Sequence, residues 1–134
     1  QTISAKELAA HEMPKLLDIE VKSGVDKEDG DKMREGFKIM DIYLNNLFGH
    51  SITKKTSIKV EASRTESALL QENGTFVFFY RTLSRDWQVP KQLGAQFHTD
   101  MRSRAAAHEY VHLHQINNGC AHALRQGRQV VPLR

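Results

Sequence analysis

Two histidines and a glutamate near the end of the chain have a spacing that suits a metal site. His108 and His112 are four residues apart, and Glu109 directly follows the first of them. On an α-helix, residues four apart lie about 40° apart around the axis and one turn along, so both imidazoles can reach one ion. Zinc binds imidazole nitrogens at about 2.0–2.1 Å, and two histidines one turn apart fit that geometry. The spacing therefore predicts that His108 and His112 bind Zn²⁺.

Glu109 is predicted to act on a proton and not to bind the metal. On a helix it points about 100° away from His108, which leaves its carboxylate beside the ion. From there it can take a proton from a metal-activated water and later deliver it to a leaving amine, while the metal polarises the scissile carbonyl. We therefore expect Glu109 to be the general base.

The residues around this motif are uncharged, which suits a buried helix because an unpaired buried charge is expensive. They are Ala106, Ala107, Tyr110, Val111 and Leu113. The alternative interpretation of the spacing is a pair of histidines on a solvated or hydrogen-bonded helix face, with no metal.

A long helix over residues 90–118 would carry the motif. It opens with a proline, which suits a first helical position, and residues 117–119, Asn-Asn-Gly, suit its end. Apolar residues recur every four positions along it: Leu93, Phe97, Met101 and Ala105. We expect the last three to pack against a strand over residues 76–80, with both motif histidines at the floor of a cleft.

The first third of the chain predicts two helices separated by a loop. Residues 4–7, Ser-Ala-Lys-Glu, have the pattern of a capping box that opens a short helix toward Leu17. Residues 22–31 are charged and contain two glycines, which is typical of a surface loop. A second helix follows, with Gly49 just past its end. Its predicted buried stripe is Met33, Phe37, Met40, Leu44 and Leu47.

Two strands are predicted between this helix and the motif helix. Residues 56–62 alternate between apolar and polar side chains, which indicates a half-buried strand. Residues 63–66 form a second capping-box pattern and predict a helical turn through Leu70. Asn73-Gly74 then predicts a turn into a β-prone strand over residues 75–82. The expected order is helix, helix, strand, strand, long helix, with a basic tail from Cys120.

Residues 107–115, Ala-His-Glu-Tyr-Val-His-Leu-His-Gln, resemble the motif helix of zincin metallopeptidases. The nearest likeness is the gluzincin branch, in which AHEY-x-H-x-x-Q is a recurring form. The metzincin variant is excluded, because it would need Gly in place of Gln115 and His in place of Asn118. The resemblance is supported by the helix–strand–strand order expected over residues 29–80.

This resemblance implies a zincin-like fold, zinc held by His108 and His112, Glu109 as general base, and peptide-bond hydrolysis. It also implies that substrate lies along an edge strand of the sheet. Residues 75–81 and residues 58–62 are the two candidates for that edge.

The gluzincin pattern includes a third zinc ligand that this sequence lacks. The family takes it from a glutamate on a following helix, often within P-x-W-x-x-E-G, but no Asp or Glu follows Glu109 here. Either the parent protein is longer, or the C-terminus was altered, or the site is incomplete. His122 and Cys120 are candidate substitutes. With two secure ligands, we expect this chain to bind zinc weakly and to hydrolyse peptides poorly or not at all.

The remaining histidines are predicted to have other roles. His11 is followed by a glutamate, but Lys15 occupies the position of a second ligand. His114 points about 200° away from His112 and cannot share its ion through the same helix face. His50 and His98 have no partner pattern, which indicates ordinary surface or core histidines.

The composition is that of one globular domain. The chain has 134 residues, of which 40% are hydrophobic and 26% charged, and no apolar run approaches the roughly 18 residues of a membrane span. The single cysteine excludes an internal disulfide and a multi-cysteine zinc site. The net charge is +3, but the basic residues are scattered without stacking aromatics among them. This pattern argues against a nucleic-acid partner.

We therefore expect residues 1–134 to form a single zincin-like metallopeptidase domain, or the N-terminal catalytic half of a longer parent. The expected fold class is α+β, with a small mixed sheet packed on helices and a long C-terminal motif helix. The expected cofactor is Zn²⁺, and the expected partner is a peptide or protein substrate. The alternative is a noncatalytic α+β binding or interaction module that retains the motif helix.

Overall fold

A computed structural model describes residues 3–63, 67–71, 73–81 and 94–120 of the chain. For residues 67, 69, 81, 94–101 and 120 the description covers the backbone alone. The elements are α1 (Ala5–Ala10), β1 (Leu17–Val21), α2 (Lys27–Phe48), β2 (Thr56–Ser63), β3 (Ser67–Leu70), β4 (Phe76–Arg81) and α3 (Gly94–Gln115). A kinked turn, Ile116–Cys120, directly follows α3, and Asn118 and Gly119 within it are not helical.

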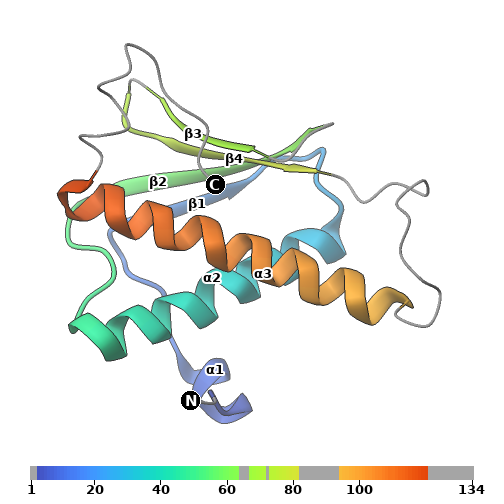
Figure 1. Cartoon of the computed structure of the whole chain (residues 1–134), viewed down its shortest axis with the longest axis horizontal. Coiled ribbons are helices and arrows are strands. Elements are labelled where there is room, and N and C mark those ends of the chain that lie inside the picture. Colours follow the sequence, from blue (N-terminus) through green and yellow to red (C-terminus); the bar gives the residue numbers. More distant parts are fainter. Residues whose placement is uncertain (1–2, 64–66, 72, 82–93, 121–134) are drawn as a thin grey trace.

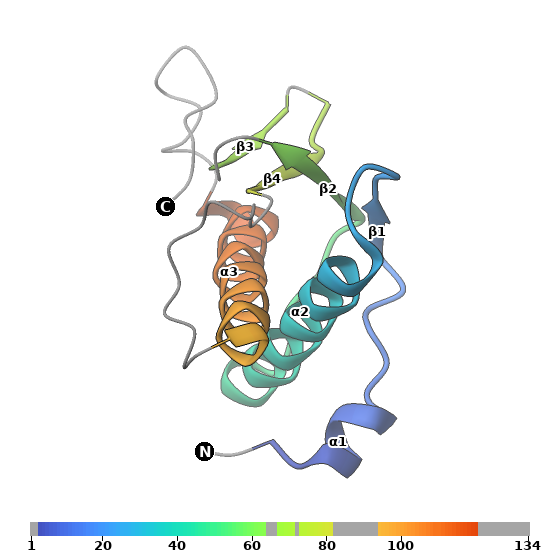
Figure 2. The ribbon, with the colours of Figure 1, turned by 90° about the vertical axis from the view of Figure 1, so that its right-hand side faces the viewer.

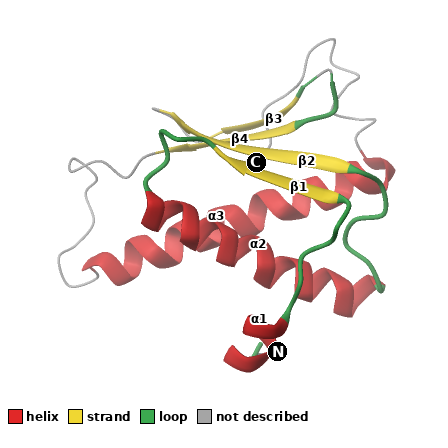
Figure 3. Cartoon of the chain, turned by 180° about the vertical axis from the view of Figure 1, so that it is seen from behind, coloured by secondary structure: helices red, strands yellow, loops and turns green. Residues whose placement is uncertain are grey.

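The strands form one mixed sheet in the order β1-β2-β4-β3. β1, β2 and β4 are parallel, whereas β3 pairs antiparallel with β4. Helices α2 and α3 lie against the same face of this sheet (Figure 1, Figure 2), and α1 lies beyond α2, away from the sheet (Figure 3). The predicted α+β class is confirmed in this form, as a small mixed sheet packed on helices that include a long motif helix.

The hydrophobic core lies between the sheet and the two long helices. The strand register puts Ile58 opposite Phe76 and Val60 opposite Phe78, and all four side chains are fully buried. From α2 the core includes Met33, Phe37 and Leu44, together with Val25 just before the helix. From α3 it includes Ala106, Tyr110 and Leu113. Burial of this apolar surface is the main favourable term that fixes α3 under the sheet.

A close approach between α2 and α3 depends on Gly36. A Cβ atom added at this position would lie 2.2 Å from the carbonyl oxygen of Ser103 and 3.1 Å from the Cβ of Ala106. Contacts this short with backbone cannot be relieved by rotating a side chain. The absence of a side chain at Gly36 therefore sets how close the motif helix comes to α2.

Several local predictions are confirmed. Ser4 caps α1 by accepting a hydrogen bond from the Glu7 amide, as a capping box requires. Gly49 ends α2 in the left-handed conformation, and Gly74 adopts the positive φ expected of the Asn-Gly turn. No helix in the described ranges is long and apolar enough to cross a membrane.

Two strands were missed by the sequence interpretation. Residues 17–21 form β1, where only the end of a short helix was expected, and residues 67–70 form β3, where a helical turn was expected. Both are short edge strands, and each pairs with a single neighbour. Strand preference depends on packing against that neighbour more than on the segment's own sequence. The local capping-box pattern at residues 63–66 was therefore misleading.

Three further predictions are wrong in detail. The loop expected over residues 22–31 ends early, because Asp26 caps α2 by accepting from the Glu28 amide. Leu47 was expected in the buried stripe of α2, but its side chain is 60% exposed. Residues 58–62 and 75–81 were the candidate edge strands, but β2 and β4 are both interior, and β1 and β3 form the edges.

Candidate metal centre

The second half of α3 presents two chemically different faces. Ala106, Tyr110 and Leu113 recur at helical spacing and are fully buried in the core. His108 is exposed and His112 is partly buried, one turn apart on another side of the helix. The apolar face anchors the helix, and the pair of histidines is left accessible.

The imidazoles of His108 and His112 converge through the nitrogens that would bind a metal. Their Nε2 atoms lie 3.2 Å apart, and the ring planes are at 81° to each other. Two nitrogens that bind one tetrahedral zinc at 2.0–2.1 Å are about 3.3 Å apart. The observed separation fits two corners of such a site.

Gln115 contacts the outer nitrogen of one of these rings. The Nδ1 atom of His112 lies 3.2 Å from the Gln115 side-chain oxygen Oε1. Because Oε1 can only accept, His112 Nδ1 must carry the hydrogen. In neutral His112 the lone pair is then on Nε2, on the side of His108.

Glu109 lies beside the pair of histidines, toward the interior of the molecule. Its side chain is 3% exposed, although it belongs to the same helical turn as the exposed His108. Burying a carboxylate is costly, and most buried polar residues of this type have a specific role or partner. The structure thus separates the two histidines from Glu109 by accessibility while it keeps them adjacent on the helix.

Among the described residues, no third metal ligand lies beside His108 and His112. In that part of the chain no group of three or more His, Cys, Asp or Glu side chains could hold a metal ion. The two substitutes considered from the sequence, the Cys120 side chain and His122, lie outside the described residues.

A buried polar cluster on the other side of α3 was not predicted. Its centre is Asp41 of α2, which is 0% exposed. The Tyr110 hydroxyl donates to Asp41 Oδ1 at 2.6 Å, and the Ser51 hydroxyl donates to the same oxygen. On Oδ2, Asp41 contacts His11 Nε2 at 2.5 Å and accepts from the Asn45 amide at 3.3 Å. We refer to these five residues as the Asp41 cluster.

The Asp41 cluster holds the motif helix in its position relative to α2, through the hydrogen bond from Tyr110 to Asp41. Burial raises the pKa of Tyr110 far above its ordinary value, and the hydrogen bond to Asp41 raises this pKa further. Tyr110 therefore stays protonated and donates to Asp41 at any ordinary pH. The sequence carried one signal for this cluster, since Asp41 lies four residues after Phe37 and three before Leu44, inside an apolar stripe.

A second polar clamp joins the first turn of α2 to the middle of α3. The Arg102 guanidinium forms an ion pair with Asp29, and both side chains are at most 10% exposed. Breaking such a buried pair by removing one partner is strongly destabilising, because the other charge is left buried. The ion pair and the Asp41 cluster hold α3 at two points along its length.

The histidines His11, His50 and His114 lie apart from the metal pair and have other contacts. His114 is turned away from the metal pair, and its Nδ1 donates to the Ser51 carbonyl at 2.6 Å. Its ring stacks on Phe48, with centroids 5.4 Å apart. His11 belongs to the Asp41 cluster, and His50 is exposed beside His114. The side chain of His98 lies outside the described residues, as do those of Phe97 and Met101, whereas Ala105 packs on the core.

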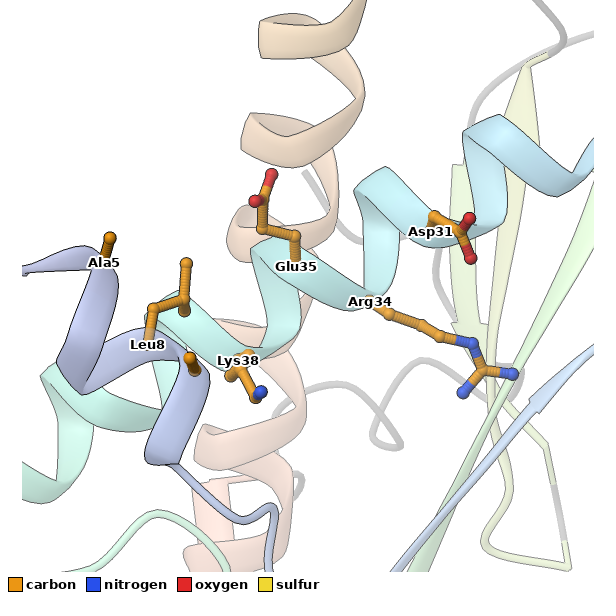
Figure 4. A pocket seen from close by; sticks show the side chains of 7 residues that line it. Ala5, Leu8, Asp31, Arg34, Glu35 and Lys38 are labelled. Carbon is orange, nitrogen blue, oxygen red and sulfur yellow. The ribbon is translucent and has the colours of Figure 1, made fainter.

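A surface pocket lies away from this centre, between α1 and α2 (Figure 4). It is lined by Ala5, Leu8, Ala9, Asp31, Arg34, Glu35 and Lys38. These side chains include no histidine or cysteine and none of the residues predicted to act in catalysis or metal binding. The pocket therefore adds nothing to the candidate metal centre.

The chain matches no protein-family model, no curated protein and no solved structure. Its candidate metal centre rests on its own geometry: two convergent imidazoles, an adjacent buried carboxylate and a helix held in place by polar clamps.

Proposed function

We propose that the chain is a zinc metallopeptidase domain of the zincin type, in which His108 and His112 bind zinc and Glu109 is the general base. The observation that carries this proposal is the 3.2 Å separation of the two Nε2 atoms. A metal ion shared by two histidines requires two ring nitrogens at about this separation, and the helix already holds them there before any metal binds.

The arrangement of the fold supports the proposal. A small mixed sheet covers two helices, and the motif helix follows the last strand of that sheet. Strand β3 is the edge on the side of α3, as Figure 2 shows. Edge strands offer unpaired backbone groups to an extended peptide. We therefore assign the substrate to β3, in place of the two interior strands suggested by the sequence.

The residues of the chain have distinct tasks in this proposal. When bound, zinc would act as a Lewis acid that polarises the scissile carbonyl. Glu109 would take a proton from the attacking water and pass it to the leaving amine. Its low exposure limits the water that competes for this proton. Tyr110 and the Asp41 cluster hold the helix so that these groups keep their positions.

The proposal predicts weak zinc binding by the 134-residue chain. Catalytic zinc normally has three protein ligands, and the described residues supply two. A single tight site in a calorimetric titration would mean that a further residue, such as His122 or Cys120, completes the site.

Zinc titration of three variants tests the proposed site. His108→Ala and His112→Ala should each remove zinc binding, whereas His50→Ala should bind zinc as the parent does, because His50 is an exposed histidine away from the pair. Equal zinc binding by the parent and the His108→Ala variant would refute the site. It would favour a noncatalytic binding module.

The role of Glu109 needs a separate measurement. Glu109→Gln preserves shape and should leave zinc binding unchanged, because Glu109 is not a ligand. Loss of a positioned general base typically lowers the rate by 10²–10⁴-fold. Zinc-dependent cleavage of a fluorogenic peptide library at the parental rate by this variant would contradict the assignment.

A further inference from the structure

The two imidazoles of the pair differ in how their outer nitrogens are held. His112 Nδ1 donates to Gln115 Oε1 at 3.2 Å. In the described part of the chain, the only hydrogen-bond contact of His108 is the one between the two Nε2 atoms. One ring is therefore oriented by a neighbour, and the other is oriented only by its partner ring.

From this asymmetry we propose that Gln115 is a positioning residue for zinc, which holds His112 as the Nδ1–H tautomer with its Nε2 lone pair directed at the metal. This inference rests on the proposed function, since it concerns the same site. Metal-binding histidines usually donate their other ring nitrogen to an oxygen acceptor, and that contact fixes both tautomer and ring orientation. The side-chain oxygen of Gln115 is such an acceptor.

The hydrogen bond between the two rings follows from this tautomer. With the His112 hydrogen on Nδ1, the 3.2 Å contact requires His108 to donate from Nε2 to the lone pair of His112 Nε2. Zinc must have lone pairs on both Nε2 atoms. His108 therefore has to move its hydrogen from Nε2 to Nδ1 when zinc binds, whereas His112 is already in the required form.

The contact contributes little to folding, which makes it easy to test. Gln115 is exposed and lies three residues after His112. Side-chain pairs at this spacing on a helix surface make only a small contribution to stability. A large effect of Gln115 on zinc affinity could not come from loss of the fold.

Two substitutions at this position separate the oxygen acceptor from the size of the side chain. Gln115→Leu removes the acceptor at similar volume, and Gln115→Glu keeps an oxygen in its place. The matched control is Asn46→Leu, which replaces an exposed side-chain amide on a different helix, α2. Thermal unfolding should show all three variants folded.

The first measurement is the tautomer of each histidine in metal-free protein at alkaline pH, from long-range ¹H–¹⁵N correlations of the ring nitrogens. The parent and Gln115→Glu should show His112 as Nδ1–H and His108 as Nε2–H. In Gln115→Leu the His112 signal should shift toward Nε2–H. An unchanged Nδ1–H form of His112 in Gln115→Leu would overturn the inference.

The second measurement is zinc affinity. Removing a contact of this kind typically weakens metal binding 10–100-fold, so Gln115→Leu should lose that much while Gln115→Glu and Asn46→Leu bind as the parent does. Parental affinity in Gln115→Leu would overturn the inference but leave the zinc site standing. Zinc binding that survives in both His108→Ala and His112→Ala would instead overturn the proposed function itself.

Discussion

The inner and outer faces of α3 differ in what surrounds their polar groups. On the inner face, the Tyr110 hydroxyl donates to a carboxylate that has three further partners, and Asp41 is fully buried. On the outer face, His108 and His112 direct the same nitrogen toward each other at an accessible surface. The inner cluster satisfies its own hydrogen bonds in the interior, whereas the outer pair is accessible to a ligand.

Under the proposed function, this difference separates residues that act in folding from residues that would bind zinc. A buried polar network contributes to stability only when its members are satisfied, and then it specifies one packing. An accessible pair of rings contributes little to stability, and under the proposed function its alignment serves zinc. Variants on the two faces should therefore separate stability from zinc binding.

The largest loss of stability is expected for Asp41→Ala. The substitution leaves the Tyr110 and Ser51 hydroxyls without their acceptor and also leaves a cavity. Each buried group left unsatisfied costs about 1–3 kcal/mol, so we expect a total loss of roughly 3–5 kcal/mol. Urea unfolding measures it. A loss below about 1 kcal/mol would show that the cluster does not hold α3, and Asn46→Ala is the exposed control on the same helix.

A smaller loss is expected for Tyr110→Phe, which keeps the ring in the core and removes one donor from Asp41. Hydrogen bonds to charged groups contribute about 1.5–3 kcal/mol, and the variant should lose about that much. Zinc affinity should change little, because the two histidines stay on the same helix. A variant that keeps parental stability but loses zinc binding would reverse the roles assigned to the two faces.

The stability difference between the parent and Tyr110→Phe should also depend on pH. The pKa of Tyr110 is raised in the folded state, first by burial and then by its hydrogen bond to Asp41. Below pH 10, the ordinary tyrosine value, both states keep the proton and the contribution of Tyr110 is fully present. Above pH 10 the unfolded chain loses the proton while the folded chain keeps it, so the contribution falls by up to about 1.4 kcal/mol per pH unit.

Urea unfolding of both proteins between pH 8 and pH 11 tests this dependence. The parent should lose its advantage over Tyr110→Phe as the pH rises above 10. A constant difference across this range would mean that Tyr110 titrates in the folded protein as it does in the unfolded chain.

The same contrast explains how much could be predicted from the sequence. The spacing of His108 and His112 was sufficient to predict their convergence, because a helix alone determines it. The helical stripe of α2 and the alternation of β2 were also readable, since each depends on a local period. The helix end at Gly49 and the turn at Gly74 were predicted correctly for the same reason.

The features that were missed depend on contacts between distant parts of the chain. Tyr110 and Asp41 are 69 residues apart, and His11 and Asp41 are 30 apart. No local pattern joins them. Strands β1 and β3 are defined by the neighbours with which they pair, and β3 was concealed by a capping-box pattern before it. The relative placement of two side chains on one helix was therefore predictable, whereas the contacts that position this helix were not.

The smallest change in stability is expected on the outer face, for His108→Ala without zinc. His108 is exposed, and exposed substitutions of this kind usually change the free energy of unfolding by less than about 0.5 kcal/mol. Zinc at ten times its dissociation constant should stabilise the parent by about 1.4 kcal/mol, because it binds the folded state, and should not stabilise the variant. Thermal unfolding with and without zinc measures both effects. Equal stabilisation of parent and variant would place the zinc elsewhere, and a large loss without zinc would make His108 a structural residue like those of the Asp41 cluster.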